Sequence, residues 1–283
     1  TSETVLEIEQ ATETSTEWQL QIRNTALIST NASISASTAM RINNGQMMTG
    51  WFTSFTQTSF ELDGSEAASV GFTLVHDESP APGLYQLTVT ARDDDNDIEF
   101  PLTLTLSVPI LPEVSFQAPF STLQIHPASP TTFEIDVQNN GNGQQGYNLF
   151  IESPIGWWVG LDNLGSSIDA ASGSTGAIPV DGARTVEMTV TPQLGVPPPA
   201  GQTYQGILRV TSQVDPTKSW SYAIPMEVIE YDSAFIEFES TPSVLRPDST
   251  VYLQYTISNQ GNTELTLLPN VDSRPGGWSV IAG

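Results

Sequence analysis

The sequence predicts an all-β fold built from tandem antiparallel β-sandwiches. Three observations support this prediction. Apolar residues alternate with polar ones over short segments, turn-forming residues separate those segments, and one sequence unit recurs along the chain. No segment has the 3.6-residue apolar period of an amphipathic helix. At 283 residues, the chain has room for two or three domains of ordinary size.

The repeat is clearest between the middle and the end of the chain. The hexapeptide VQNNGN at 137–142 returns as ISNQGN at 257–262, an offset of 257 − 137 = 120. Pro127 and Pro247 share that offset, and Gly156-Trp157 matches Gly277-Trp278 one residue later. Three features at nearly the same offset indicate two copies of one unit.

A weaker copy precedes these two. Trp18 corresponds to Phe133 at an offset of 133 − 18 = 115, but Trp51 corresponds to Trp157 at an offset of 157 − 51 = 106. This first copy therefore contains about nine extra residues, and its turn lacks the glycine. We predict copy one at 1–109, copy two at 110–231 and copy three at 232–283, the last with only the front half of the unit. Both connections are short and lack a flexible Gly/Ser tract, and proline stiffens the first, which predicts a rod of stiffly joined modules.

Each alternating segment is expected to form a strand with one apolar face. In copy one the clearest segments are 85–91 and 98–108, and in copy two they are 133–137, 147–151, 186–190, 204–210 and 222–228. In copy three they are 235–238, 251–257 and 265–268. Short strands of this kind, separated by turns, are typical of immunoglobulin-like sandwiches.

Half a sandwich in copy three exposes an apolar face and unpaired strand edges. Two ways of completing it remain open. We expect the sequence to be part of a longer polypeptide that supplies the missing strands. The alternative is a neighbouring molecule that adds a strand, which makes the protein a filament subunit.

Every copy places an indole directly after a glycine, while the next position is Phe, Trp or Ser. Because neighbouring residues of a strand point to opposite faces, the constant position is predicted to be core and the variable one to face outward. The glycine is expected to let the backbone turn sharply. The three indoles are those of Trp51, Trp157 and Trp278.

The outward-facing Trp158 is the candidate for stacking on a sugar, with Tyr147 or Trp220 beside it, because a flat apolar ring complements a pyranose face. The preferred interpretation is packing, since isolated exposed aromatic residues are common. Two further features receive structural explanations. The Asn-Gly turns suit the positive φ of hairpin connections, and Tyr85 and Tyr204 are expected to form tyrosine corners.

These motifs resemble the NPCBM-associated immunoglobulin-like family, whose modules accompany α-galactosidases and many secreted or surface proteins. The motifs are Asn139–Asn142, Pro154–Val159, Val180–Gly182 and Gly201–Tyr204. The resemblance covers copy two fully, copy three in its front half and copy one mostly in its back half. It implies a sandwich of about seven strands that serves as an accessory, spacer or adhesion module and has no catalytic residues.

One acidic cluster lies between two predicted strands, at a hairpin tip. Its carboxylates belong to Asp93, Asp94, Asp95 and Asp97. Charge runs usually face solvent, which is the preferred interpretation. The alternative is a calcium site, because Ca²⁺ takes six to eight oxygen ligands, although the pattern does not match an EF-hand loop.

Composition excludes several classes of function. The net charge of −24, with Lys218 as the only lysine, opposes binding to nucleic acid or to anionic membranes. There is no cysteine for a disulfide, a thiolate nucleophile or a zinc site. The only histidines, His76 and His126, lie in different copies and lack a triad motif, so we predict no enzyme.

The sequence thus predicts a non-catalytic segment of a larger secreted or cell-surface protein, which acts as stalk, scaffold or adhesion module. Its partners are expected to be other domains of the same protein or cell-surface proteins. The alternative is an accessory carbohydrate-binding segment of an extracellular hydrolase. No cofactor is expected apart from calcium at the acidic hairpin, and no part of the segment is expected to insert into a membrane.

Overall fold

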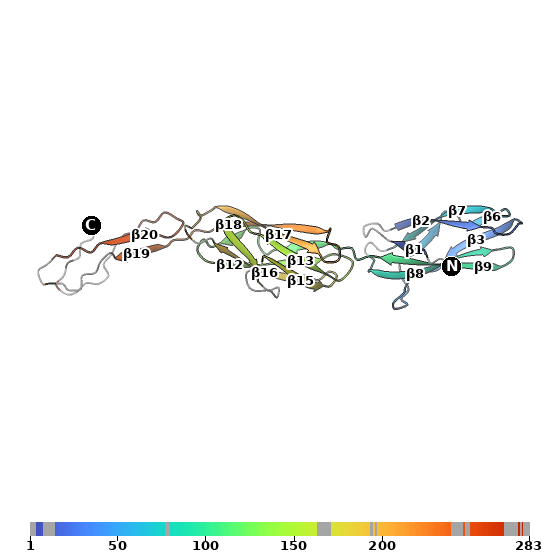
Figure 1. Ribbon diagram of the computed structural model, residues 1–283, viewed down its shortest axis with the longest axis horizontal. Coiled ribbons are helices and arrows are strands. Elements are labelled where there is room, and N and C mark those ends of the chain that lie inside the picture. The colour runs from blue at the N-terminus through green and yellow to red at the C-terminus, as the bar shows by residue number, and fades with distance from the viewer. Residues whose placement is uncertain are drawn as a thin grey trace.

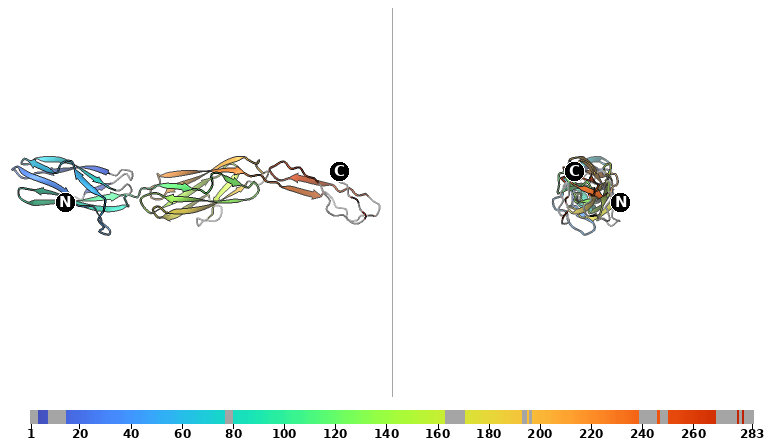
Figure 2. Two further views of the ribbon diagram at one scale, coloured as in Figure 1. Left: turned by 180° about the vertical axis from the view of Figure 1, so that it is seen from behind. Right: turned by 90° about the vertical axis from the view of Figure 1, so that its left-hand side faces the viewer.

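The computed structural model describes residues 4–7, 15–76, 80–162, 171–192, 195, 197–238, 246, 250–268, 277 and 279. All regular structure among them is β, arranged as two sandwiches and a terminal hairpin in one line (Figure 1). Figure 2 shows the same line from behind, and its end-on view shows the three parts overlapping along a common axis. The chain is therefore a tandem array of immunoglobulin-like β-sandwich modules.

Copy one packs a larger sheet against a smaller one. The larger has the order β1-β9-β8-β3-β6 with β4 also paired to β8, and the smaller has the order β2-β7-β5. Its strands are β1 (Thr4–Glu7), β2 (Ser15–Arg23), β3 (Thr30–Ala36), β4 (Met40–Arg41), β5 (Phe52–Phe55), β6 (Ser59–Leu62), β7 (Ala67–Val75), β8 (Gly83–Asp93) and β9 (Ile98–Val108).

Copy two has sheets of order β11-β18-β17-β13-β15 and β10-β12-β16-β14. Its strands are β10 (Val114–Gln117), β11 (Leu123–Ile125), β12 (Thr131–Asn139), β13 (Gln145–Glu152), β14 (Trp157–Leu161), β15 (Ser172–Ile178), β16 (Ala183–Pro192), β17 (Thr203–Ser212) and β18 (Ser219–Val228).

The two sandwiches share one topology. Strand by strand, β1-β9-β8-β3-β6 matches β11-β18-β17-β13-β15, and β2-β7-β5 matches β12-β16-β14. Even the one parallel pairing recurs, as β1 with β9 and β11 with β18. What distinguishes them is β10, which joins the smaller sheet of copy two, and β4, which belongs to the extra residues of copy one.

The predicted role of the recurring indole is confirmed in both sandwiches. Trp51 is 4% exposed and Trp157 is 8% exposed, and each packs in the core of its own copy. The glycine before each indole has a left-handed φ, 89° at Gly50 and 84° at Gly156, which a side chain would oppose. Gly277 has the same φ of 85°, but the Trp278 prediction lies outside the described residues.

Copy three contributes a two-stranded sheet of β19 (Ala234–Phe238) and β20 (Tyr255–Asn259). Ala234 opposes Asn259 just as Val114 opposes Asn139 in copy two, so the hairpin repeats β10 and β12 in register. Two expectations need correction. The predicted strand at 251–257 begins only at Tyr255, and 265–268 is not a strand. Among the described residues, β20 pairs only with β19, whereas its counterpart β12 pairs with both β10 and β16.

Candidate functional site: the junctions between copies

A single asparagine side chain fastens each module to the one before it. At the first junction, Asn142 Nδ2 donates to the carbonyl oxygens of Pro80 and Pro109, both at 3.0 Å. Its Oδ1 accepts from the Leu111 N–H at 2.7 Å, and its own N–H donates to the Leu111 carbonyl at 3.3 Å. Asn142 is only 6% exposed, so water does not replace these bonds easily.

The second junction repeats this arrangement atom for atom. Asn262 Nδ2 donates to the carbonyl oxygens of Pro198 at 3.1 Å and Ile229 at 2.9 Å. Its Oδ1 accepts from the Tyr231 N–H at 2.7 Å, and its N–H donates to the Tyr231 carbonyl at 2.9 Å. The last residue of the Asn-x-Gly-Asn motif is therefore a connector between modules, a role that sequence reasoning missed.

The motif glycine is needed for the approach of the linker, which corrects the expectation of a positive φ. Neither Gly141 nor Gly261 has a left-handed φ. A Cβ added at Gly141 would lie 2.5 Å from the Leu111 carbonyl oxygen, and one at Gly261 would lie 2.2 Å from that of Tyr231. Backbone cannot yield as a flexible side chain can, so only glycine leaves room for the linker.

Copy one forms the same turn without glycine. Asn24 Nδ2 donates to the carbonyls of Leu62 and Asp63, as Asn139 Nδ2 does to those of Ile178 and Pro179. The next two motif positions are Ala26, which has a Cβ, and Leu27, which is 91% exposed. This end of copy one therefore lacks both the space and the amide that form a junction.

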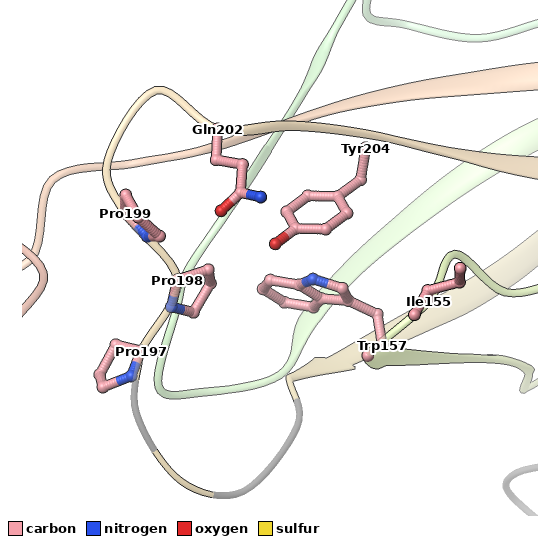
Figure 3. Close-up of a pocket in the computed structure, with 8 residues that line it drawn as sticks. Ile155, Trp157, Pro197, Pro198, Pro199, Gln202 and Tyr204 are labelled. Carbon is pink, nitrogen blue, oxygen red and sulfur yellow. The ribbon is translucent and has the colours of Figure 1, made fainter.

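An aromatic groove lies beside the second junction. It has a volume of about 370 Å³ and is lined by Ile155, Trp157, Pro197, Pro198, Gln202 and Tyr204, among others. Figure 3 shows the Tyr204 ring above the Trp157 indole, with Pro198 at the edge of the indole. The ring centroids are 5.3 Å apart at an interplanar angle of 62°. Sequence reasoning assigned both rings structural roles and did not predict a groove. The signal that could have pointed to it is that Trp157 and Tyr204 are equivalent to Trp51 and Tyr85 of copy one.

The tyrosine-corner prediction is confirmed for Tyr85, whose hydroxyl donates to the Ala81 carbonyl at 2.6 Å. Among the residues the structure describes, the Tyr204 hydroxyl makes no such bond, and Tyr204 instead lines the groove. Two aromatic residues at equivalent positions thus have different surroundings.

The sugar-stacking candidates do not form one face. Trp158 is partly buried, and its benzene ring covers Gly160, where an added Cβ would lie 1.8 Å from Cη2. Tyr147 is fully buried, so the expectation that it lies beside Trp158 on a sugar-stacking face is wrong. Its hydroxyl donates to Asn139 Oδ1 at 2.8 Å, and burial raises its pKa. Trp220 packs edge-on against Tyr147 at 6.2 Å. Sugar stacking by Trp158 stays a prediction.

The four aspartates of the acidic hairpin each engage a donor of the protein. Asp93 accepts from Thr30 Oγ1 and the Asn96 amide, and Asp95 accepts from the Asn31 backbone and side chain. Asp94 accepts from Ser33 Oγ at 2.8 Å, and Asp97 pairs with Arg92. Within the described ranges, no three acidic or histidine side chains are grouped to hold a metal ion. Calcium binding here stays the alternative to a solvent-facing charge run.

These hydrogen bonds also affect titration. The Asn96 side chain and Thr30 hold the pKa of Asp93 below its ordinary value. The backbone N–H of Asn31, followed by its side chain, lowers the pKa of Asp95. Both carboxylates are therefore stabilised as anions without a cation.

Neither histidine lies in a catalytic arrangement among the described residues. His76 is 3% exposed and packs against Trp51 at 5.7 Å, while His126 packs edge-on against Tyr231 at 4.7 Å. The first belongs to the core of copy one and the second to the second junction. The prediction of a non-enzymatic protein is neither supported nor opposed by this packing.

Comparisons with known proteins give only distant likenesses. No protein-family model matches the chain, and no curated protein does. DIP-gamma IG1+IG2 is 11% identical, with 81% of this chain and 94% of that chain covered and a TM-score of 0.33. The CupB2 chaperone of Pseudomonas aeruginosa is 9% identical (78% and 96% covered, TM-score 0.28). A family 123 glycoside hydrolase from Clostridium perfringens is 13% identical (44% and 25% covered, TM-score 0.30). Likenesses this distant carry no argument about function.

Proposed function

We propose that the chain is a non-catalytic, stiff stalk segment of a larger extracellular or cell-surface protein, with NPCBM-associated immunoglobulin-like modules as its repeating unit. The observation that carries the proposal is the asparagine connector, formed with the same four hydrogen bonds at both junctions. A module tied to its neighbour at several points resists bending, whereas a flexible linker allows modules to reorient.

Charge supports the same role. A net charge of −24 keeps the chain soluble and opposes its association with other acidic molecules. No helix in the described part of the chain is long and apolar enough to cross a membrane. In this proposal the segment acts as a spacer that holds the other domains of the protein at a fixed distance and orientation.

Small-angle scattering of the chain in solution tests the stalk. The expected profile is that of a rod with a narrow cross-section. The double variant Asn142→Ala with Asn262→Ala is expected to scatter as separate modules on flexible joints. Asn140→Ala is the matched control, because Asn140 belongs to the same turn but is exposed. A flexible wild-type chain contradicts the proposal.

A further inference from the structure

The extra residues of copy one occupy the place that is an open groove in copy two. Strand β3 of copy one and β13 of copy two lead to Trp51 and Trp157, but copy one makes a longer connection. Within it, β4 pairs with β8 at Tyr85 and Gln86, and the following Ile42 N–H donates to the Leu84 carbonyl. Copy one thus adds a short strand of its own beside the tyrosine.

An arginine is the central side chain of that insertion. The Arg41 guanidinium lies 5.8 Å from the centroid of the Tyr85 ring, and its Nη2 donates to the Pro82 carbonyl at 2.7 Å. A cation above an aromatic ring is attracted by the ring's negative face. Within the insertion, Ala39 is 1% exposed and Met48 packs against the same core as Trp51 and Tyr85, which are 4% and 0% exposed.

Copy two has the equivalent tyrosine and strand edge but no insertion beside them. Tyr204 opposes Met226 as Tyr85 opposes Leu106, so the two tyrosines are equivalent. The pairing of β17 with β13 ends at Ile207, opposite Glu152. In the described part of the chain, residues 203–206 therefore pair only with β18 and have one open edge.

The backbone groups on that open edge can be identified. Just past the end of β17, the Gln213 N–H donates to the Gly146 carbonyl on the β13 side, and just before its start the Gln202 carbonyl accepts from the Val228 N–H on the β18 side. Alternate residues of a strand bond to opposite neighbours, so Thr203 and Gln205 present their backbone groups to the open edge. An unpaired edge beside an aromatic groove is suited to accept an added strand.

We propose that the copy-two groove binds an extended peptide segment that carries an arginine. The backbone of the peptide pairs with Thr203 and Gln205, its apolar side chain enters the space beside Trp157, and its guanidinium lies over Tyr204. The chain itself shows this mode of binding, because Met40–Arg41 occupies the equivalent place in copy one. The acidic surface of the protein attracts a cationic segment. This proposal does not depend on the stalk function.

The test uses a fluorescein-labelled peptide with the sequence of residues 38–48, titrated with the full chain and followed by fluorescence anisotropy. Saturable binding is expected. The same peptide with Arg41→Ala is expected to bind about five-fold more weakly or worse, as loss of a cation–π contact implies. Absence of binding at about millimolar protein, a concentration that detects even weak complexes, or equal binding of both peptides overturns the proposal.

Two variants of the chain separate the groove from other surfaces. Tyr204→Leu is expected to remove the preference for arginine. Gln205→Pro removes one N–H from the open edge, and the residue opposite on β18 is Pro225, which has no N–H to lose a partner. It is expected to abolish binding while β17 and β18 stay paired. Phe150→Ala, at an exposed site on β13, is the control. Unchanged binding by Gln205→Pro, with an unchanged circular dichroism spectrum, overturns the proposal.

Discussion

At the scale of single residues, the residues of the motif turn differ between copies according to whether a linker packs against the turn. Asn139 and Asn24 close the same turn in two copies through equivalent hydrogen bonds. Copies two and three have glycine and asparagine at the next two motif positions, where copy one has Ala26 and Leu27. The glycine and asparagine of this motif are typical turn residues, but in copies two and three they belong to the interface between modules.

The first prediction concerns Gly141. Gly141→Ala places a Cβ against the Leu111 carbonyl, and overpacking of this kind costs about 1–3 kcal/mol. We expect faster amide hydrogen exchange in the linker peptide 109–115, because the Leu111 N–H loses its bond to Asn142. Ala26→Gly is the matched control and should leave linker exchange unchanged. Equal exchange in Gly141→Ala and the wild type contradicts the steric argument.

The second prediction compares two adjacent tryptophans. Trp157→Ala removes a core indole and should lower the free energy of unfolding by about 3–5 kcal/mol in urea denaturation. Trp158→Ala should cost much less, since this ring only covers Gly160 on the outer face. Similar losses for both variants would show that the inward and outward assignments are wrong.

At the scale of elements, Asp93 and Asp95 of the acidic hairpin between β8 and β9 accept hydrogen bonds from neutral donors. The pKa values of Asp93 and Asp95 are lowered by folding. Their contribution to stability is therefore full above the unfolded-state pKa, near 4, and is lost as the pH falls through the lower folded-state value. This predicts a decrease in melting temperature below about pH 4.

Asp95→Asn tests this hairpin prediction. The variant cannot titrate at residue 95, so its melting temperature should depend less on pH in the acidic range than that of the wild type. Millimolar calcium at neutral pH should leave the melting temperature unchanged, because the carboxylates already accept hydrogen bonds from Thr30, Asn31, Ser33 and Asn96. A clear rise with calcium would support the metal site instead.

The sequence predicted most of the longer strands, such as β8, β12 and β17, because apolar and polar residues alternate along them. The repeats also placed Trp51 and Trp157 correctly, since a buried indole tolerates few substitutes. The junctions and the groove were not predictable in this way. The contacts of Asn142 reach Pro80, which is 62 positions away, and no local pattern encodes such a partner. The open edge at Gln205 becomes evident only when both copies are superposed strand by strand.

At the scale of the whole molecule, the strands run along the rod (Figure 1). The asparagine connectors join residues of adjoining copies. The two junctions are chemically alike, so the orientation of one module relative to the next is expected to repeat. The peptide groove lies in copy two near the second joint, where Pro198 lines the groove and its carbonyl accepts from Asn262.

The most direct test of the central claim is a distance distribution across the first junction. The chain has no cysteine, so Ser54→Cys and Ser221→Cys provide two exposed and unique sites for spin labels, one in each sandwich. Pulsed electron paramagnetic resonance should give one narrow distance for the otherwise wild-type chain. Adding Asn142→Ala should broaden the distribution, while adding Asn140→Ala should not. A distribution that is already broad with Asn142 in place, or one that stays narrow without it, would contradict the asparagine connector.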